Sequence, residues 1–217
     1  EDALRSVGQM FARLGAQDIR KTSQGTIDFR LQRQLRAYAK LDTPPHRVKP
    51  IPVQVVRHAL ACAYSAGGTE ATKAISDMIA IAFFFLLRPG EYTGDGKDSD
   101  PFRLEDIQVF VGRTRYSGSH LLTLLPTVLG AATGVSLTFT TQKNSVQGKV
   151  IHHGCSGSLT LCPVKAVLRR ILHLREHTRN LKTPLASYFQ AHKLCAVAAK
   201  DVTSALRLLV ATIGPSL

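Results

Sequence analysis

One arginine stands where a buried segment meets the edge of the predicted fold. The ten residues 78–87 are all apolar and run directly into Arg88, which Pro89, Gly90 and Glu91 follow. A helix that is apolar on every side is a buried helix, and this one is shorter than the roughly 20 residues that a membrane span requires. Because proline disfavours helical geometry in the residue before it, we expect the helix to end at Arg88. The sequence therefore predicts a guanidinium held rigidly at the edge of the core.

Local features leave two roles open for this arginine. A planar guanidinium makes paired hydrogen bonds with phosphate or carboxylate oxygens, so Arg88 could bind an anionic ligand. A cation at the end of a helix also complements the helix dipole, so Arg88 could simply finish the helix. Buried helices often end in a basic residue, and the local pattern by itself favours this second interpretation.

The composition points to a polyanion as partner. The chain has 217 residues, enough for one large or two small domains, with 28 lysines and arginines against 15 acids and a formal net charge of +13. The basic excess lies in both end regions and is absent from residues 51–100. Because no five like charges occur in a row, we place this charge on folded elements rather than on a disordered arm. Such an excess on a folded protein favours nucleic acid.

Cysteine and histidine spacing argues against a metal site. His152, His153, Cys155 and Cys162 cluster in the sequence, but their spacing does not match that of structural zinc sites. We predict no metal and no cofactor, and we interpret His152 as a phosphate contact near a basic groove. The segment GDGK at 94–97 lacks the glycine-rich span and the Ser/Thr of a phosphate-binding loop. Without CxxC spacing or a signal peptide, the sequence predicts a reduced intracellular compartment, which is the nucleus in a eukaryote.

The N-terminal part predicts a small helical domain followed by a linker. Apolar residues recur at helical spacing over residues 3–14 and 27–40. The second helix carries four basic residues that either meet solvent or contact phosphate: Arg30, Arg33, Arg36 and Lys40. Residues 42–52 hold four prolines together with Arg47 and Lys49. We expect this segment to be a stiff linker between residues 1–41 and 53–217.

The remaining chain predicts helices interrupted by a small sheet. We expect helices at 53–66, from the N-cap Thr69 to Leu87, from Pro163 onward, shortly after Pro184, and at about 200–210. In the helix that begins at Pro163, we place Lys165, Arg169 and Arg170 off the apolar stripe. We expect strands at 104–111, 135–141 and 149–153, with the turn at 142–148. Apolar and polar residues alternate from Val135 to Thr141, which predicts a strand with one buried face. The predicted fold class is mainly α with a small inserted antiparallel β-sheet, an α+β fold.

These pieces together resemble the tyrosine recombinases. The family's first catalytic arginine lies in a motif TGLR-x-x-E, and LLRPGE at 86–91 is similar to it, with Arg88 as the arginine and Glu91 as the supporting acid. The LEDI at 104–107 loosely resembles the family's L-x-x-x-D-I, with shorter spacing. The family's catalytic lysine lies in a β-hairpin turn, which TQKN at 141–144 matches with Lys143; Lys149 competes for the same role.

The Cys-Pro-Val at 162–164, before a basic helix, is most similar to recombinases of eukaryotic mobile elements, the crypton-like and tyrosine-recombinase retroelement groups. The resemblance implies that residues 1–41 are the C-terminal part of a helical core-binding domain. It implies that residues 53–217 are the N-terminal part of the catalytic domain. The family's H-x-x-R pair and its nucleophilic tyrosine would follow the last helix, where the sequence stops, so we expect both ends of the chain to be cut.

The recombinase reaction accounts for the residue types. In the family a tyrosine attacks a backbone phosphate and forms a 3′-phosphotyrosyl intermediate, which later rejoins DNA. Arg88 would stabilise the charge on the non-bridging oxygens, and Lys143 would protonate the departing 5′ oxygen. The expected DNA contacts are Arg30, Arg33, Arg36, Lys40, Arg47, Lys49, Lys149 and His152. The resemblance implies double-stranded DNA as partner, a homo-oligomer on DNA for the full-length protein, no membrane, and, in this chain, binding without cleavage.

Two other functions remain open. The chain could be a non-catalytic DNA-binding protein, or a decayed copy, derived from such an element. It could instead be a helical interaction scaffold without a nucleic-acid partner, in which case any DNA affinity would be weak and insensitive to salt. An H-x-x-R motif and a tyrosine downstream of Leu217 would favour the recombinase, whereas a stop codon there would favour the binding protein.

Overall fold

The computed structural model describes residues 2–18, 20–41, 50–94, 100–139 and 148–213. The chain forms two compact units, Glu1–Lys49 and Pro50–Leu217. The division falls within the segment predicted as a linker.

The first unit is a pair of helices. The helices α1 (Asp2–Arg13) and α2 (Phe29–Leu41) confirm the two predicted helices within two residues at each end. The segment between them is fixed by an Asp18–Arg20 ion pair of 2.6 Å and by a hydrogen bond of 2.8 Å from the Asp28 N–H to the Arg20 carbonyl. Two helices cannot bury all their apolar residues, and Leu14 and Phe29 stay 70% and 69% exposed.

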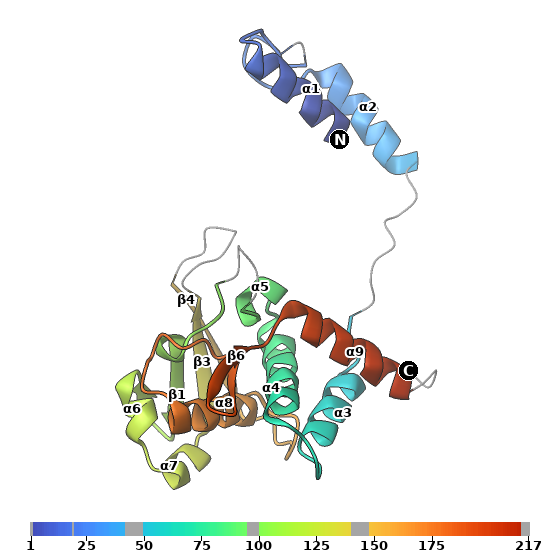
Figure 1. Cartoon of the computed structure of the whole chain (residues 1–217). Coiled ribbons are helices and arrows are strands. Elements are labelled where there is room, and N and C mark those ends of the chain that lie inside the picture. The colour runs from blue at the N-terminus through green and yellow to red at the C-terminus, as the bar shows by residue number, and fades with distance from the viewer. Residues whose placement is uncertain (1, 19, 42–49, 95–99, 140–147, 214–217) are drawn as a thin grey trace. The chain divides into compact units, whose positions relative to one another are not determined.

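The second unit contains the sheet and the remaining helices (Figure 1). Its helices are α3 (Val53–Ala63), α4 (Glu70–Phe85), α5 (Pro89–Tyr92), α6 (Ser119–Thr123), α7 (Pro126–Gly130), α8 (Pro163–His177) and α9 (Ala199–Ile213), with a 3-10 turn, η1 (Leu104–Asp106). Its strands are β1 (Ile107–Val111), β2 (Thr114–Ser117), β3 (Gly134–Phe139), β4 (Lys149–Gly154), β5 (Ser187–Gln190) and β6 (Lys193–Ala196). The described residues are therefore mainly helical with a small antiparallel sheet, as predicted.

The main sheet has the strand order β2-β1-β3-β4, and all its pairs are antiparallel. β3 and β4 pair from Gly134 opposite Gly154 to Phe139 opposite Lys149. The prediction that β3 has one exposed face was wrong, because Ser136 is only 1% exposed. The imidazole of His152 covers it, with 3.0 Å between His152 Nδ1 and the Ser136 hydroxyl oxygen.

The structure differs from the predicted elements in several places, and the short helices α5, α6 and α7 were not predicted. Residues 104–106 form η1, so the predicted strand 104–111 begins only at Ile107. Strand β2 was not predicted because its four residues are polar and largely exposed. The helix expected after Pro184 is instead the hairpin β5–β6, whose turn residues Ala191 and His192 have positive φ values of 47° and 65°. This turn conformation normally selects Asn or Gly, so Ala191 and His192 did not indicate a hairpin.

Helix α4 packs against α3, α8, α9 and β5, and it carries a fully buried carboxylate, that of Asp77. Arg169 on α8 donates two hydrogen bonds of 2.8 and 2.6 Å to Asp77 Oδ1, and the Tyr64 hydroxyl donates one of 2.6 Å to Oδ2. The Arg169 guanidinium also lies 4.6 Å from the centre of the Tyr64 ring. Burial lowers the pKa of Arg169, but the charge and hydrogen bonds of Asp77 reverse this, so the net shift is upward. This cluster joins α3, α4 and α8.

The neighbouring Arg170 corrects the sequence interpretation, which placed it off the apolar stripe of α8. It is 1% exposed, and it donates hydrogen bonds to the carbonyl oxygens of Leu185, at 3.3 Å, and Ser187. Burial lowers the pKa of its guanidinium. The side chain therefore attaches the chain before β5 to α8 through backbone acceptors.

One turn further along α8, His173 lies between α4 and β5. Its Nδ1 is 3.0 Å from Glu70 Oε2, and its Nε2 accepts a 3.0 Å hydrogen bond from the Phe189 N–H. This geometry requires the neutral ring with hydrogen on Nδ1. Burial, followed by the charge of Arg170, lowers the pKa of His173 despite the opposing effect of Glu70.

Asp77→Ala should lower the free energy of unfolding of the second unit by roughly 3–5 kcal/mol, the usual effect of removing one member of a buried ion pair. Urea unfolding followed by circular dichroism measures it. The matched control is Thr69→Ala, which removes only the α4 cap, a 3.2 Å hydrogen bond from the Thr72 N–H, and should cost about 1 kcal/mol. If Asp77→Ala lowered the free energy of unfolding no more than the control does, Asp77 would not be a member of a stabilising buried ion pair.

The stability of the second unit should also fall as pH decreases from about 7 to 5. Because the folded-state pKa of His173 lies below its unfolded value near 6.5, the unfolded chain binds the extra proton first, and acid favours unfolding. His173→Gln, which keeps an acceptor for the Phe189 N–H, should flatten this dependence. The exposed His120 supplies the control, since His120→Gln should leave the slope of stability against pH unchanged.

Candidate nucleic-acid interface

The end of α4 determines where Arg88 lies. Thr69 caps the start of the helix, as predicted, but the helix ends at Phe85 rather than at Arg88. Leu86 adopts the left-handed conformation, φ 54° and ψ 43°, and the Leu87 N–H closes the last turn on the Ala82 carbonyl at 3.0 Å. The left-handed conformation of Leu86 therefore ends the helix. Leu86 lies two positions before Arg88, the residue at which Pro89 was expected to end it.

Arg88 then precedes the first residue of α5. Its backbone N–H donates a 2.8 Å hydrogen bond to the Glu91 carboxylate, the return contact of a helix N-terminus. Glu91 thus supports Arg88 through the backbone, and the guanidinium itself is exposed. Within the described part of the chain no carboxylate forms an ion pair with it, which leaves its paired donors available to an anion.

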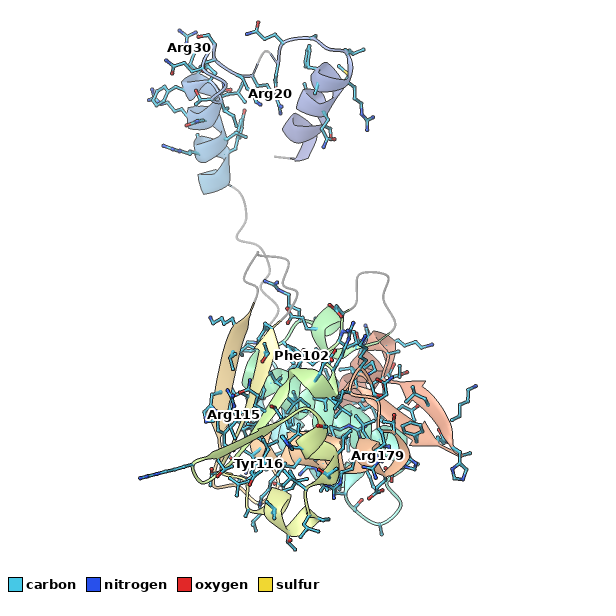
Figure 2. The ribbon with its side chains drawn as sticks, turned by 90° about the vertical axis from the view of Figure 1, so that its left-hand side faces the viewer. Arg20, Arg30, Phe102, Arg115, Tyr116 and Arg179 are labelled. Carbon is cyan, nitrogen blue, oxygen red and sulfur yellow. The ribbon has the colours of Figure 1, made fainter. Side chains whose placement is uncertain are left out.

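The end of the β3–β4 hairpin at which Phe139 pairs with Lys149 lies beside α5. The ring of Phe139, the last residue of β3, is 4.9 Å from that of Phe102, and the Phe102 N–H donates to the Glu91 carbonyl at 3.1 Å. Lys149 is paired with Phe139 and is exposed. Figure 1 shows α5 and this end of β4 on the same side of the unit. Phe102, which is labelled in Figure 2, is only 6% exposed. Arg88 and Lys149 therefore belong to one end of the fold.

The expected catalytic lysine, Lys143, lies in residues 140–147, outside the described residues. The described strand ends place the two attachment points of that segment, Phe139 and Gly148, at the α5 end of the sheet, where the Gly148 N–H donates to the Phe139 carbonyl at 2.8 Å. The convergence of Arg88 and Lys143 on one phosphate stays a prediction.

A third cation near α5 differs from these two because its charge is compensated. Arg103 lies 3.3 Å from Asp100 and 3.6 Å from Glu105, and its N–H donates to Asp106 Oδ2 at 2.8 Å. Arg103 therefore fixes the start of η1 and offers less to an external phosphate than Arg88 or Lys149.

The two adjacent histidines of β4 lie on opposite faces of the sheet. The His152 ring contacts Phe110, with 4.9 Å between ring centres, whereas the His153 ring contacts Phe85 of α4 at 4.5 Å. They cannot share a metal ion, and no group of three or more potential ligands occurs among the residues with described positions. His152 is exposed. Its contact with phosphate stays a prediction.

The predicted basic residues of the first unit lie on α2. Arg30, Arg33 and Arg36 are exposed, and their three-residue spacing places them on one side of the helix. Lys40 is in the last turn of α2, but its side chain lies outside the described part, as do Arg47 and Lys49. A contact of these residues with DNA is not tested by the structure.

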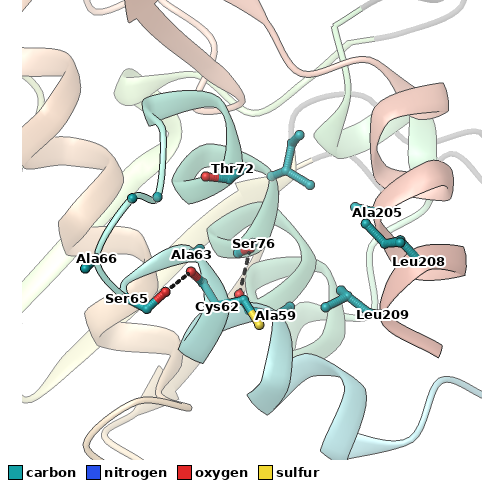
Figure 3. Close-up of a pocket in the computed structure, with 13 residues that line it drawn as sticks. Ala59, Cys62, Ala63, Ser65, Ala66, Thr72, Ser76, Ala205, Leu208 and Leu209 are labelled. Carbon is teal, nitrogen blue, oxygen red and sulfur yellow. Dashed lines mark hydrogen bonds between the residues drawn. The ribbon is translucent and has the colours of Figure 1, made fainter. Parts of the chain in front are cut away.

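A pocket of about 330 Å³ between α3, α4 and α9 offers no anion site (Figure 3). No charged residue lines it. The Ser76 hydroxyl donates to the Ala59 carbonyl at 3.1 Å, and the Ser65 hydroxyl donates to the Cys62 carbonyl at 2.8 Å. Its polar side chains are thus engaged within the protein, and its walls are suited only to apolar groups.

Comparison of the chain with protein-family models, with curated proteins and with solved structures finds no match. In the part of the chain with described positions, no helix combines the length and apolarity that crossing a membrane requires.

Glu91→Ala should lower the free energy of unfolding by about 1 kcal/mol, the usual effect of removing a helix N-terminal acceptor, because the Arg88 N–H loses its acceptor. Urea unfolding measures the change. Glu176→Ala, which removes an exposed acid on α8, should have almost no effect. Equal effects of the two substitutions would show that Glu91 does not support Arg88.

Proposed function

We propose that the chain binds double-stranded DNA through the end of the second unit that carries Arg88 and Lys149, as part of the catalytic domain of a tyrosine recombinase. One observation carries the proposal. The contacts from Phe139 through Phe102 to Glu91 attach the hairpin end to the turn that presents Arg88. Two exposed cations without described acidic partners thereby share one end of a protein with a formal net charge of +13.

The recombinase assignment rests on the resemblance of LLRPGE and TQKN to the family motifs and on this placement. An arginine at a fixed backbone position suits the pentavalent phosphate, whose negative charge is spread over non-bridging oxygens. A lysine on a hairpin turn beside it suits proton transfer to the departing 5′ oxygen. In this role Glu91 is a positioning residue for Arg88, and the lysine is Lys143 or Lys149.

Two tyrosines of the described part, Tyr92 and Tyr64, are unsuited to act as the nucleophile. Tyr92 is 9% exposed and packs in the core. Tyr64 donates to Asp77, and burial together with that carboxylate raises its pKa, so it is a poor nucleophile. The covalent step requires a tyrosine other than these two.

The DNA affinity of the chain should fall steeply with salt, because displaced counterions return to the phosphates at high salt. Fluorescence anisotropy with a labelled duplex, between about 50 and 200 mM salt, measures the slope of log K against log [salt]. Lys149→Gln should weaken binding and reduce that slope by about 0.9, the value for one phosphate contact.

Arg113→Gln is the matched control for this experiment. Arg113 is also exposed but lies between β1 and β2, at the sheet end opposite Lys149, because β1 and β3 are antiparallel. The control should keep the parental slope. Weak binding without salt dependence would support the interaction scaffold instead, and equal losses for both variants would place the interface elsewhere.

A further inference from the structure

One histidine holds the outer part of the β5–β6 hairpin against the helices. The Nε2 of His173 on α8 accepts a 3.0 Å hydrogen bond from the Phe189 N–H of β5, and its Nδ1 lies 3.0 Å from Glu70 Oε2 on α4. An imidazole whose Nε2 is an acceptor carries its hydrogen on Nδ1 and is neutral. A second proton would sit on Nε2 and point at the Phe189 N–H. Two donors would then face each other, and the hydrogen bond would be lost.

The base of the hairpin is held by contacts that involve no histidine. The Arg170 guanidinium donates to the carbonyl oxygens of Leu185 and Ser187. The Val197 N–H, which follows β6, donates to the Ala186 carbonyl at 2.9 Å. These four backbone positions are all buried. Protonation of His173 therefore leaves the attachments of the base in place.

The hairpin tip, residues 189–194, is by contrast weakly packed. Residues 190–194 are exposed, and the turn residues Ala191 and His192 are in the left-handed region, which is unfavourable for residues with a Cβ. The Phe189 ring stacks on that of the exposed His177, with 4.7 Å between ring centres. Segments with little buried apolar surface open at a lower free energy than the whole domain unfolds. The hydrogen bond to His173 thus ties a weakly packed tip to the core.

Charged and titratable groups face His173 from both helices. On α4, Glu70 also pairs with Lys73, at 2.8 Å through Oε1, and β5 contributes the backbone N–H and the ring of Phe189. Burial, and then the charge of Arg170, lower the pKa of His173, and Glu70 opposes them. The closed hairpin therefore favours the neutral ring, whereas an open hairpin lets the ring recover its ordinary pKa near 6.5. The groups on α8 that face His173 are Arg170, Glu176 and His177.

We propose that His173 is an acid-sensitive latch: when it binds a proton, the hairpin tip detaches from α8 while the base of the hairpin and the rest of the second unit stay folded. The contacts of His173 with Phe189 and Glu70, and the exposed tip beyond them, carry this inference. It does not rest on the proposed DNA binding. The Gly94 N–H, just after α5, donates to the carbonyl of the buried Val197 at 3.1 Å, so the α5 end of the fold keeps its attachment when the tip opens.

The sign of the pH dependence follows from the two states of the hairpin. Because the pKa of His173 is lower in the closed hairpin than in the open one, the open hairpin binds the proton more readily, and acid favours opening. With one proton, the equilibrium constant for opening rises by at most about tenfold for each pH unit below about 6.5. It stops rising once His173 is protonated in the closed hairpin as well.

Amide hydrogen exchange of the full chain, followed by NMR between about pH 7.5 and 5, tests the latch. The protection factor of the Phe189 N–H should fall by up to about tenfold per pH unit below about 6.5. At every pH it should lie at least about tenfold below that of the Val197 N–H, and low urea should not change it, because local opening exposes little surface. Equal protection factors and equal urea dependence of the two amides would show that the tip opens only on global unfolding, and would overturn the proposal.

Two variants assign the effect to one ring. His173→Gln should remove the pH dependence of the Phe189 amide, whereas His177→Phe, which keeps a ring to stack on Phe189, should retain it. The reverse result would overturn the proposal. The ring nitrogen shifts of His173 in the parental chain should also show the neutral Nδ1–H form at about pH 7.5, and an imidazolium there would overturn the proposal. If a variant does not fold, these shifts and the two parental amides still decide it.

Discussion

The charge of Asp77 constrains the second unit more than any other single group. A carboxylate that is fully buried must keep its partners, because an uncompensated charge in the core is far more costly than a lost contact. Its partners come from the end of α3 and the middle of α8, and they hold α4 in one rotation about its axis. Since the last turn of α4 leads directly into Leu86 and Arg88, the placement of the candidate phosphate ligand depends on this buried pair.

Long-range charge contacts of this kind are the part of the fold that the sequence did not reveal. Arg169 and Asp77 are 92 positions apart, and each alone resembles an ordinary helix-surface residue. The signal that could have identified Asp77 is its place directly before Met78, at the start of an apolar run. Arg170 was misplaced for a related reason, because its partners are backbone carbonyls, which no residue pattern announces.

Elements with strong periodicity were predictable, and elements defined by their neighbours were not. The start of α8 and the approximate bounds of β3 were predicted because their apolar spacing is regular, and β4 was predicted as the strand that returns from the turn after β3. β2 exists because it pairs with β1, and the β5–β6 turn uses Ala191 and His192 where Asn or Gly would be expected. At the candidate site, the sequence pattern predicted the β3–β4 hairpin, but the pairing of Lys149 with Phe139 comes from the structure. The Phe102–Phe139 contact joining it to α5 depends on packing between elements more than 30 residues apart.

Leu86 has a consequence for how firmly Arg88 is directed. A leucine in the left-handed region costs about 1–2 kcal/mol relative to its preferred conformations, and its side chain is 88% exposed, so it recovers little by burial. If this residue relaxed into the helix, each added residue would rotate the following chain by about 100° around the α4 axis, and the guanidinium would leave the hairpin side. The orientation of Arg88 therefore depends on the packing of the whole second unit around Leu86. A glycine in place of Leu86 would make that orientation less dependent on the surrounding packing.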